Sequence, residues 1–145
     1  MVADKLMKGM PARILLETTV MQEGEVFKHS FDEMGRIVRM NENYYLRFTE
    51  SGDDGVANLI KIAPEGVVQI TRHTENKTIL EFDEDNHTFT NYATPAGILR
   101  MRVETTRMST SYSQKPFAGE IEVDYEIYME DDQIGTYQVR LRFTT

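Results

Sequence analysis

The chain has 145 residues, of which 40% are hydrophobic and 28% are charged, and its formal net charge at pH 7 is -8. This length and balance are typical of a single soluble globular domain. The acidic charge opposes a phosphate backbone, and no apolar run approaches the roughly 18 residues that a membrane span requires. We therefore expect neither nucleic acid nor a membrane as a partner.

The first 11 residues, MVADKLMKGMP, lack the apolar core of a signal peptide. We expect residues 1–11 to form a flexible N-terminus, with room for a short helix, and residues 12–145 to form one domain. The chain contains no cysteine, which fits a reducing compartment. The expected location is the cytoplasm.

Apolar and polar residues alternate with a period of two from Ala12 to Phe143, and this pattern predicts about eleven strands. Their sequences, in chain order, are ARILLETTV, EVFKHSF, RIVRM, YYLRFT, VANLIKI, VVQITRHT, TILEF, TFTNYA, ILRMRVETTRM, EIEVDYEIYM and a last strand from Tyr137 to Phe143. Short connections such as DEMG, NEN and APEG separate them and supply turn residues. The prolines Pro11, Pro64, Pro95 and Pro116 all fall in gaps, as expected for residues that cannot donate to a ladder.

Turns that join sequence neighbours indicate an all-β antiparallel meander, which must close into a barrel or fold into two facing sheets. We predict a single closed barrel and keep a β-sandwich as the alternative, because Greek-key sandwiches need longer connections. One candidate for such a connection exists, from Ser109 to Ala118.

The last two strands form a predicted hairpin with an apolar and a charged face. With a loop at Asp131 to Gln133, the apolar face pairs Tyr125 with Val139 and Val123 with Leu141, and the charged face pairs Asp124 with Arg140 and Glu122 with Arg142. The two arginines have two interpretations: an anion site, or a solvated ladder of cross-strand charge pairs.

From Tyr44 onward the chain resembles the YwiB-like family, small uncharacterised proteins of Gram-positive bacteria with a calycin-like, lipocalin-like barrel. The segments that carry the resemblance are YLRFTE at Tyr45 to Glu50, TPAGILRMRVETTRM at Thr94 to Met108, and GEIEVDYEIYM at Gly119 to Met129. The resemblance implies a single bacterial, cytoplasmic barrel domain and carries over no catalytic residues. Lipid transport would be an analogy from fold alone.

No residue set in the sequence indicates catalysis, a cofactor or a metal. Asp83 to Asn86 resembles the start of a calcium loop, but Thr88 stands where such a loop needs glycine. Acidic pairs at Asp53-Asp54 and Asp131-Asp132 are typical of turns. His29, His73 and His87 fall on different strands or strand ends, where they are typically structural unless the fold brings them together.

Two functional hypotheses follow, and an enzyme is the least favoured third. Large adaptable side chains fall mainly on the predicted inward rows, among them Met101, Met108, Tyr125, Met129, Tyr137 and Phe143. They could line a site for a small apolar or amphipathic ligand at the barrel mouth, with Ser109 to Ala118 as a lid. They could equally fill the barrel, and the protein would then be a protein-interaction or structural module, for example a homodimer through a strand edge or through the Tyr-rich outer surface. A filled interior would argue against the first hypothesis.

Overall fold

The computed structural model describes residues 2–52 and 54–145 and consists of one helix and ten strands. The elements are α1 (Val2–Lys8), β1 (Met10–Gln22), β2 (Glu25–Met40), β3 (Asn43–Thr49), β4 (Ala57–Ile62), β5 (Val68–His73), β6 (Thr78–Phe82), β7 (Thr88–Thr94), β8 (Gly97–Ser113), β9 (Ala118–Met129) and β10 (Asp132–Thr144). No helix in these two ranges combines the length and the apolar character needed to cross a membrane.

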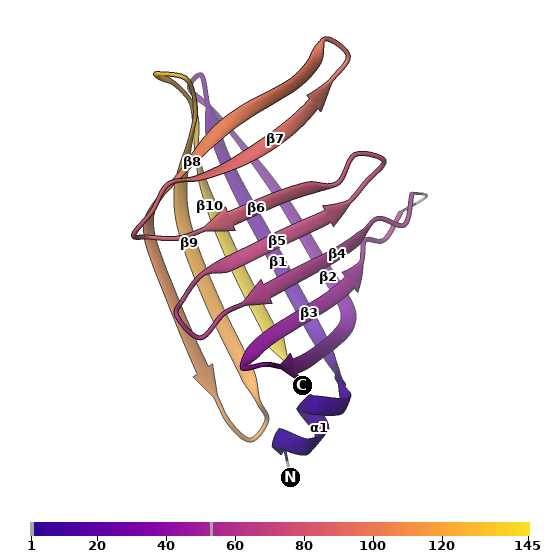
Figure 1. Ribbon diagram of the computed structural model, residues 1–145. Helices are drawn as coiled ribbons and strands as arrows, with labels where there is room; N and C mark the ends of the chain where they lie inside the picture. Colours follow the sequence, from indigo (N-terminus) through magenta and orange to yellow (C-terminus); the bar gives the residue numbers. More distant parts are fainter. Residues whose placement is uncertain (1, 53) are drawn as a thin grey trace.

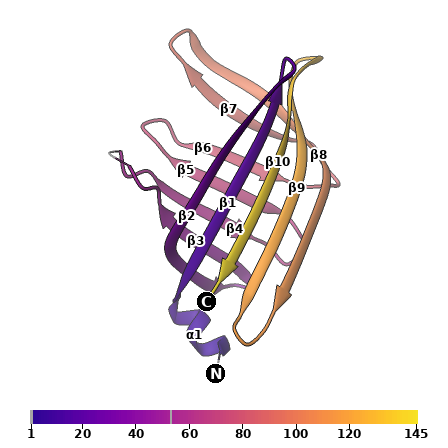
Figure 2. The same cartoon turned by 180° about the vertical axis from the view of Figure 1, so that it is seen from behind.

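The strands form one antiparallel sheet in the order β6-β5-β4-β3-β2-β1-β10-β9-β8-β7. Every neighbouring pair is consecutive in sequence except β1 with β10, which join the two ends of the meander. The long strands β1, β2, β8, β9 and β10 stand side by side, and the short strands β3 to β6 run across them (Figures 1 and 2). The sheet thereby curls into a nearly closed barrel, which confirms the predicted fold class rather than the sandwich.

The last gap in the barrel, between β6 and β7, is bridged by side chains. The hydroxyl of Thr90 donates to the carbonyl oxygen of Ile79 at 2.8 Å, and that of Thr88 donates to the carbonyl oxygen of Glu81. No backbone ladder joins these two strands in the part of the chain that the structure describes. Two hydroxyl groups therefore satisfy carbonyl groups that a ladder would otherwise pair.

The apolar rows predicted from the alternation do face the interior. Ile121, Val123 and Leu141 have exposed fractions of 1%, 0% and 2%. Across the barrel, the rings of Phe82 on β6 and Tyr125 on β9 meet with centroids 4.6 Å apart. Side chains from opposite walls thus touch, and this part of the interior is filled by the protein itself.

Two expected connections are wrong, because the chain continues there as strand. The segment DEMG, expected to separate two strands, lies inside β2, whose residues pair with β1 without interruption from Glu25 to Ile37. Ten strands therefore replace the expected eleven. Within this segment an added Cβ at Gly35 would lie 2.1 Å from the carbonyl oxygen of Arg47, so glycine marks a close backbone approach and no turn.

The long connection expected from Ser109 to Ala118 is also shorter than predicted. Strand β8 runs on to Ser113 and β9 begins at Ala118, which leaves a turn at residues 114–117. Polar side chains at Ser109 and Ser111 hid the alternation, because this end of β8 is exposed on both faces. The expected lid is largely strand.

The C-terminal hairpin keeps its predicted faces but shifts its predicted register by two residues. Its turn is at Glu130 and Asp131, with Glu130 at a φ of 58°, and β10 already begins at Asp132. The observed pairs include Val123 with Val139, Glu122 with Arg140 and Glu120 with Arg142. A shift of two preserves both faces, so alternation alone could not select between the two registers.

The N-terminal segment contains helix α1, which packs against β2, and β1 begins at Met10. Leu6 of α1 is 4% exposed and belongs to the core cluster. The helix ends at Lys8 and is followed by Gly9, which has a φ of 90° and whose amide donates to the carbonyl oxygen of Leu6 at 3.2 Å.

Candidate functional site

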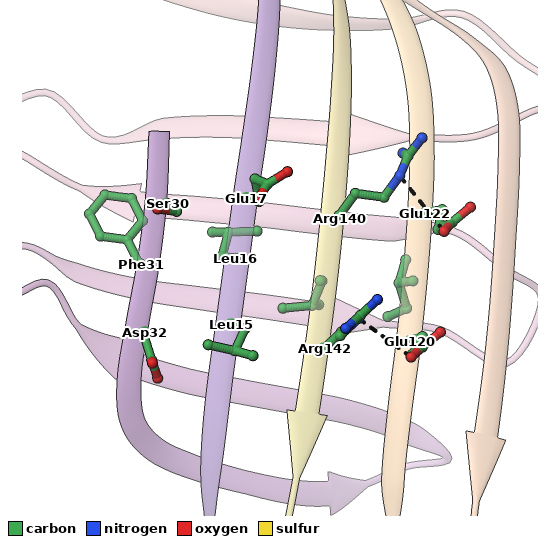
Figure 3. Close-up of a pocket in the computed structure, with 12 residues that line it drawn as sticks. Leu15, Leu16, Glu17, Ser30, Phe31, Asp32, Glu120, Glu122, Arg140 and Arg142 are labelled. Atoms are coloured by element: carbon green, nitrogen blue, oxygen red, sulfur yellow. Dashed lines mark ion pairs between the residues drawn. The ribbon is translucent and has the colours of Figure 1, made fainter. Parts of the chain in front are cut away.

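One hollow lies on the outer face of the long strands and has a volume of about 550 Å³ (Figure 3). Leu15 and charged side chains of β9 and β10 line it. Arg140 and Arg142 lie beside Glu122 and Glu120, with nitrogen to oxygen distances of 3.7 and 3.4 Å (Figure 3). The two arginines singled out in the sequence therefore meet the carboxylates of the neighbouring strand.

Further pairs extend this arrangement to three strands. Arg140 also reaches Asp124 at 3.1 Å, and Arg107 of β8 donates to Glu122 at 2.6 Å. The hydrogen bond from Arg107 and the charge of Arg140 lower the pKa of the Glu122 carboxyl. Since the arginines already face carboxylates, the geometry fits a solvated charge ladder better than an anion site.

A second concave region follows the free edge of β8, and we call it the β8 crevice. It consists of two hollows of about 350 and 250 Å³, which share Gly66 and Thr110. Their walls are β8, the β2–β3 hairpin, the β4–β5 turn and the loop after β6. The residues that line them are Arg39, Glu42, Tyr44, Ile62, Ala63, Pro64, Glu65, Gly66, Val67, Asp83, Glu84, Asp85, Met108, Ser109, Thr110 and Tyr112.

The larger hollow of the crevice is aromatic. The ring of Tyr44 lies 5.4 Å, between centroids, from the rings of both Tyr112 and Phe117. Phe117 is buried, whereas Tyr112 is 42% exposed. Partial burial raises the pKa of Tyr112 to about 12, so its hydroxyl is neutral at physiological pH. This hollow offers an aromatic wall with hydroxyl groups, and the charged residues Arg39 and Glu42 also line it.

The smaller hollow is acidic. Glu65, Glu84 and Asp85 line it and are exposed. Asp83, also in its lining, accepts hydrogen bonds from the backbone amide of Asp85 at 3.0 Å and from the side chain of Asn86 at 3.2 Å. The cluster that resembled a calcium loop is thus built as a turn. None of the salt bridges within residues 2–52 and 54–145 involves Glu65, Glu84 or Asp85.

A polar network lies near the end of β3. The Glu50 carboxylate is 8% exposed and accepts hydrogen bonds from the Arg72 guanidinium and from the Asn58 amide, all at 2.7 Å. The bonds from Arg72 are the main reason that the pKa of Glu50 lies below its usual range. This network was not predicted from the sequence, although Asn58 and Arg72 lie in phase with the apolar rows of VANLIKI and VVQITRHT. Polar residues within an otherwise apolar row of a strand are the feature of the sequence that could have indicated this network.

The other candidate residues do not come together. His87 lies 2.8 Å from Glu104, whereas His29 and His73 lie opposite Thr18 and Ala57. No group of three or more histidine and acidic side chains could hold a metal ion in the part of the chain that is described. Asp53 of the Asp53-Asp54 turn lies outside the described residues.

The inward methionines and aromatics have mixed positions. Tyr125 and Phe143 are buried, and Met101, Met108 and Tyr137 pack against the core while partly exposed. Met129 is 36% exposed. Of these, Met108 alone lines the β8 crevice.

Residues 14–141 match the family model of a domain of unknown function, DUF1934. The chain belongs to this family. The DUF1934 chain is also similar to the ywiB protein from Bacillus subtilis, whose crystal structure aligns with a TM-score of 0.78 at 17% identity over 99% of this chain and 96% of that one. This likeness confirms the barrel over the whole length and the resemblance found in the sequence. No curated protein matches the DUF1934 chain.

Proposed function

We propose that the protein is a protein-interaction module that receives an extended segment as an additional strand on β8. The observation that carries this proposal is the free edge of β8. Residues Met108–Ser113 pair with β9 on one side, while β7 pairs with β8 no further than Val103. No other strand pairs with these residues in the part of the chain that the structure describes, and the β4–β5 turn and the loop after β6 line hollows beside them. Unpaired backbone groups of an edge strand are a template for such pairing.

The chemistry of this edge distinguishes it from the other long free edge of the sheet. Residues Glu25–Met34 of β2 pair with β1 alone, but they include Glu25, Lys28, Asp32 and Glu33. Charges of this kind discourage strand addition. The segment from Met108 to Ser113 has no charged residue and no proline, and its bulge lies earlier, between Thr105 and Arg107. The edge of β8 between Met108 and Ser113 therefore lacks protection by charge, by proline or by a bulge.

The filled interior supports an interaction module over a carrier with a deep ligand cavity. Phe82 and Phe143 are both nearly inaccessible to solvent; the ring of Phe82 packs on Tyr125 of β9, and the ring of Phe143 packs on Phe117 of the β8–β9 turn. Space for a partner lies instead outside this core, along β8.

A small apolar or amphipathic ligand at the barrel mouth is a second candidate, favoured by the aromatic hollow beside Tyr44 and Tyr112. Its volume of about 350 Å³ is near the lower end of the range for small-molecule sites. Native mass spectrometry of freshly purified protein, with fatty acids as the added probe, tests this candidate. Binding that Tyr112→Ala abolishes would support it, and the absence of any bound species would contradict it. For either candidate we propose a cytoplasmic location, which the absence of cysteine supports.

Amide hydrogen exchange tests the strand-addition proposal. The probe is a short peptide of alternating valine and threonine, and two further versions carry N-methyl groups on alternate amides, each along one of the two edges. We expect alternate amides between Met108 and Ser113 to gain at least about tenfold protection with the first peptide, because an added strand supplies acceptors to the free edge.

The free edge of β2 is the internal control, and its amides should stay unchanged. Methylation should abolish the protection when it blocks the edge of the peptide that pairs with β8. Binding without any change at β8, or equal binding of peptides methylated on either edge, would refute strand addition.

A further inference from the structure

We infer that the segment received by β8 carries a lysine or arginine two residues away from a large apolar side chain, both on the face directed into the β8 crevice. This inference rests on the proposed function and names the partner chemistry of the same surface. It follows from the order in which the two hollows succeed each other along β8.

The acidic hollow supplies the charge preference. Glu65 from the β4–β5 turn and Glu84 and Asp85 from the loop after β6 bring three exposed carboxylates to one side of the crevice. On β9, by contrast, Glu120 and Glu122 lie within 3.4 and 2.6 Å of arginines. The crevice carboxylates lack such partners among the described residues, and a cationic side chain would supply one.

The register of β8 supplies the spacing. Met108, Ser109 and Thr110 line the acidic hollow, whereas Thr110 and Tyr112 line the aromatic one. Successive side chains on one face of a strand are about 6.8 Å apart, because each residue rises about 3.4 Å. A strand paired with β8 would therefore place residues i and i+2 over the two hollows, one basic and the other apolar.

The same charges argue against a second copy of this chain as the occupant. An antiparallel pair of β8 edges would bring Glu65, Glu84 and Asp85 of both copies toward one interface, and each chain already has a net charge of -8. Like charges brought together oppose association. A basic segment is the partner that complements the crevice.

Three synthetic peptides test the inference by fluorescence anisotropy at low and high salt. The first has lysine and phenylalanine at positions i and i+2 of an extended valine–threonine background. The second has glutamate in place of lysine, and the third has the lysine moved to i+1, which directs it to the opposite face. We expect the first to bind about tenfold more tightly than either of the others, and this difference to shrink in high salt.

A triple variant, Glu65→Gln with Glu84→Gln and Asp85→Asn, should remove most of the preference for the first peptide. The matched control is Glu23→Gln with Glu25→Gln and Glu75→Gln, which removes the same charge at exposed positions outside the crevice. This control should keep the preference, which separates a local effect from the net charge.

The outcomes separate this inference from the proposed function. If all three peptides bind equally and protect the amides of Met108–Ser113, strand addition stands and the partner chemistry is refuted. If no peptide protects those amides, both fail. A concentration-dependent dimer that Ser111→Lys abolishes would identify a second copy as the occupant and would also overturn the inference.

Discussion

The network of Glu50, Arg72 and Asn58 makes a contribution to stability that one substitution can measure. Glu50→Gln keeps the shape of the side chain but replaces a carboxylate oxygen with a nitrogen that donates. The bidentate contact with Arg72, at 2.7 Å for both bonds, is then lost. Hydrogen bonds to charged groups contribute about 1.5 to 3 kcal/mol, and breaking a fully buried ion pair costs about 3 to 5 kcal/mol.

The expected loss lies below that upper range, because the Arg72 side chain is 47% exposed and can return to water. Glu50 and Asn58 are 8% and 4% exposed, so water reaches their side chains less easily once the contact is broken. We therefore expect a loss of about 2 kcal/mol in the free energy of unfolding. For a domain of this size this corresponds to a fall of about 6 °C in Tm, measured by circular dichroism or calorimetry.

The pH dependence of this effect follows from the lowered pKa of Glu50. A carboxyl whose pKa is lower in the folded state stabilises the fold above its unfolded pKa, near 4.5, and this contribution disappears as the pH falls through the folded value. The gap in Tm between wild type and Glu50→Gln should therefore narrow below about pH 4. The control is Asp32→Asn, which breaks the exposed pair with Arg13 and should change Tm little. A Tm unchanged by Glu50→Gln, or a gap that persists in acid, would refute the reasoning.

Two further predictions concern positions where the sheet depends on single groups. Gly35→Ala should destabilise the protein by about 1 to 3 kcal/mol in denaturant unfolding, because its Cβ would lie 2.1 Å from the carbonyl oxygen of Arg47; an unchanged midpoint would contradict the close approach. Thr90→Val should lower the free energy of unfolding by about 1 to 2 kcal/mol and speed amide exchange in β6 and β7, because it removes the hydrogen bond to Ile79 across the gap between these strands, which we call the seam. Thr94→Val, which removes a similar bond in an exposed hairpin, is its control, and equal effects of the two variants would argue against a special role of the seam.

The inner and outer faces of the strands could be predicted from the sequence because they depend on a local rule. Side chains alternate along a strand whatever it pairs with, so Ile121, Val123 and Leu141 were assigned to the interior correctly. Predictions were wrong where they concerned how two strands pair with each other. The hairpin register differs from its prediction by two residues, which leaves every face unchanged.

The candidate site was less accessible to sequence reasoning than the fold. Tyr44 and Tyr112 are 68 positions apart in the chain, and Glu65, Glu84 and Asp85 come from two separate turns. No local pattern links such residues. The long connection expected from Ser109 to Ala118 is wrong in its local structure, because residues 109–113 belong to β8 and residues 114–117 form the turn.

By itself, the sequence determined that this protein is an antiparallel meander with one apolar and one polar face, because alternation and turn residues act within a few positions of each other. The tertiary structure alone decided where the meander closes, which edges stay free and which turns meet beside β8. Barrel closure, the free edges and the meeting of these turns depend on how far the sheet twists before its ends meet. That total twist is the sum of small contributions from every strand.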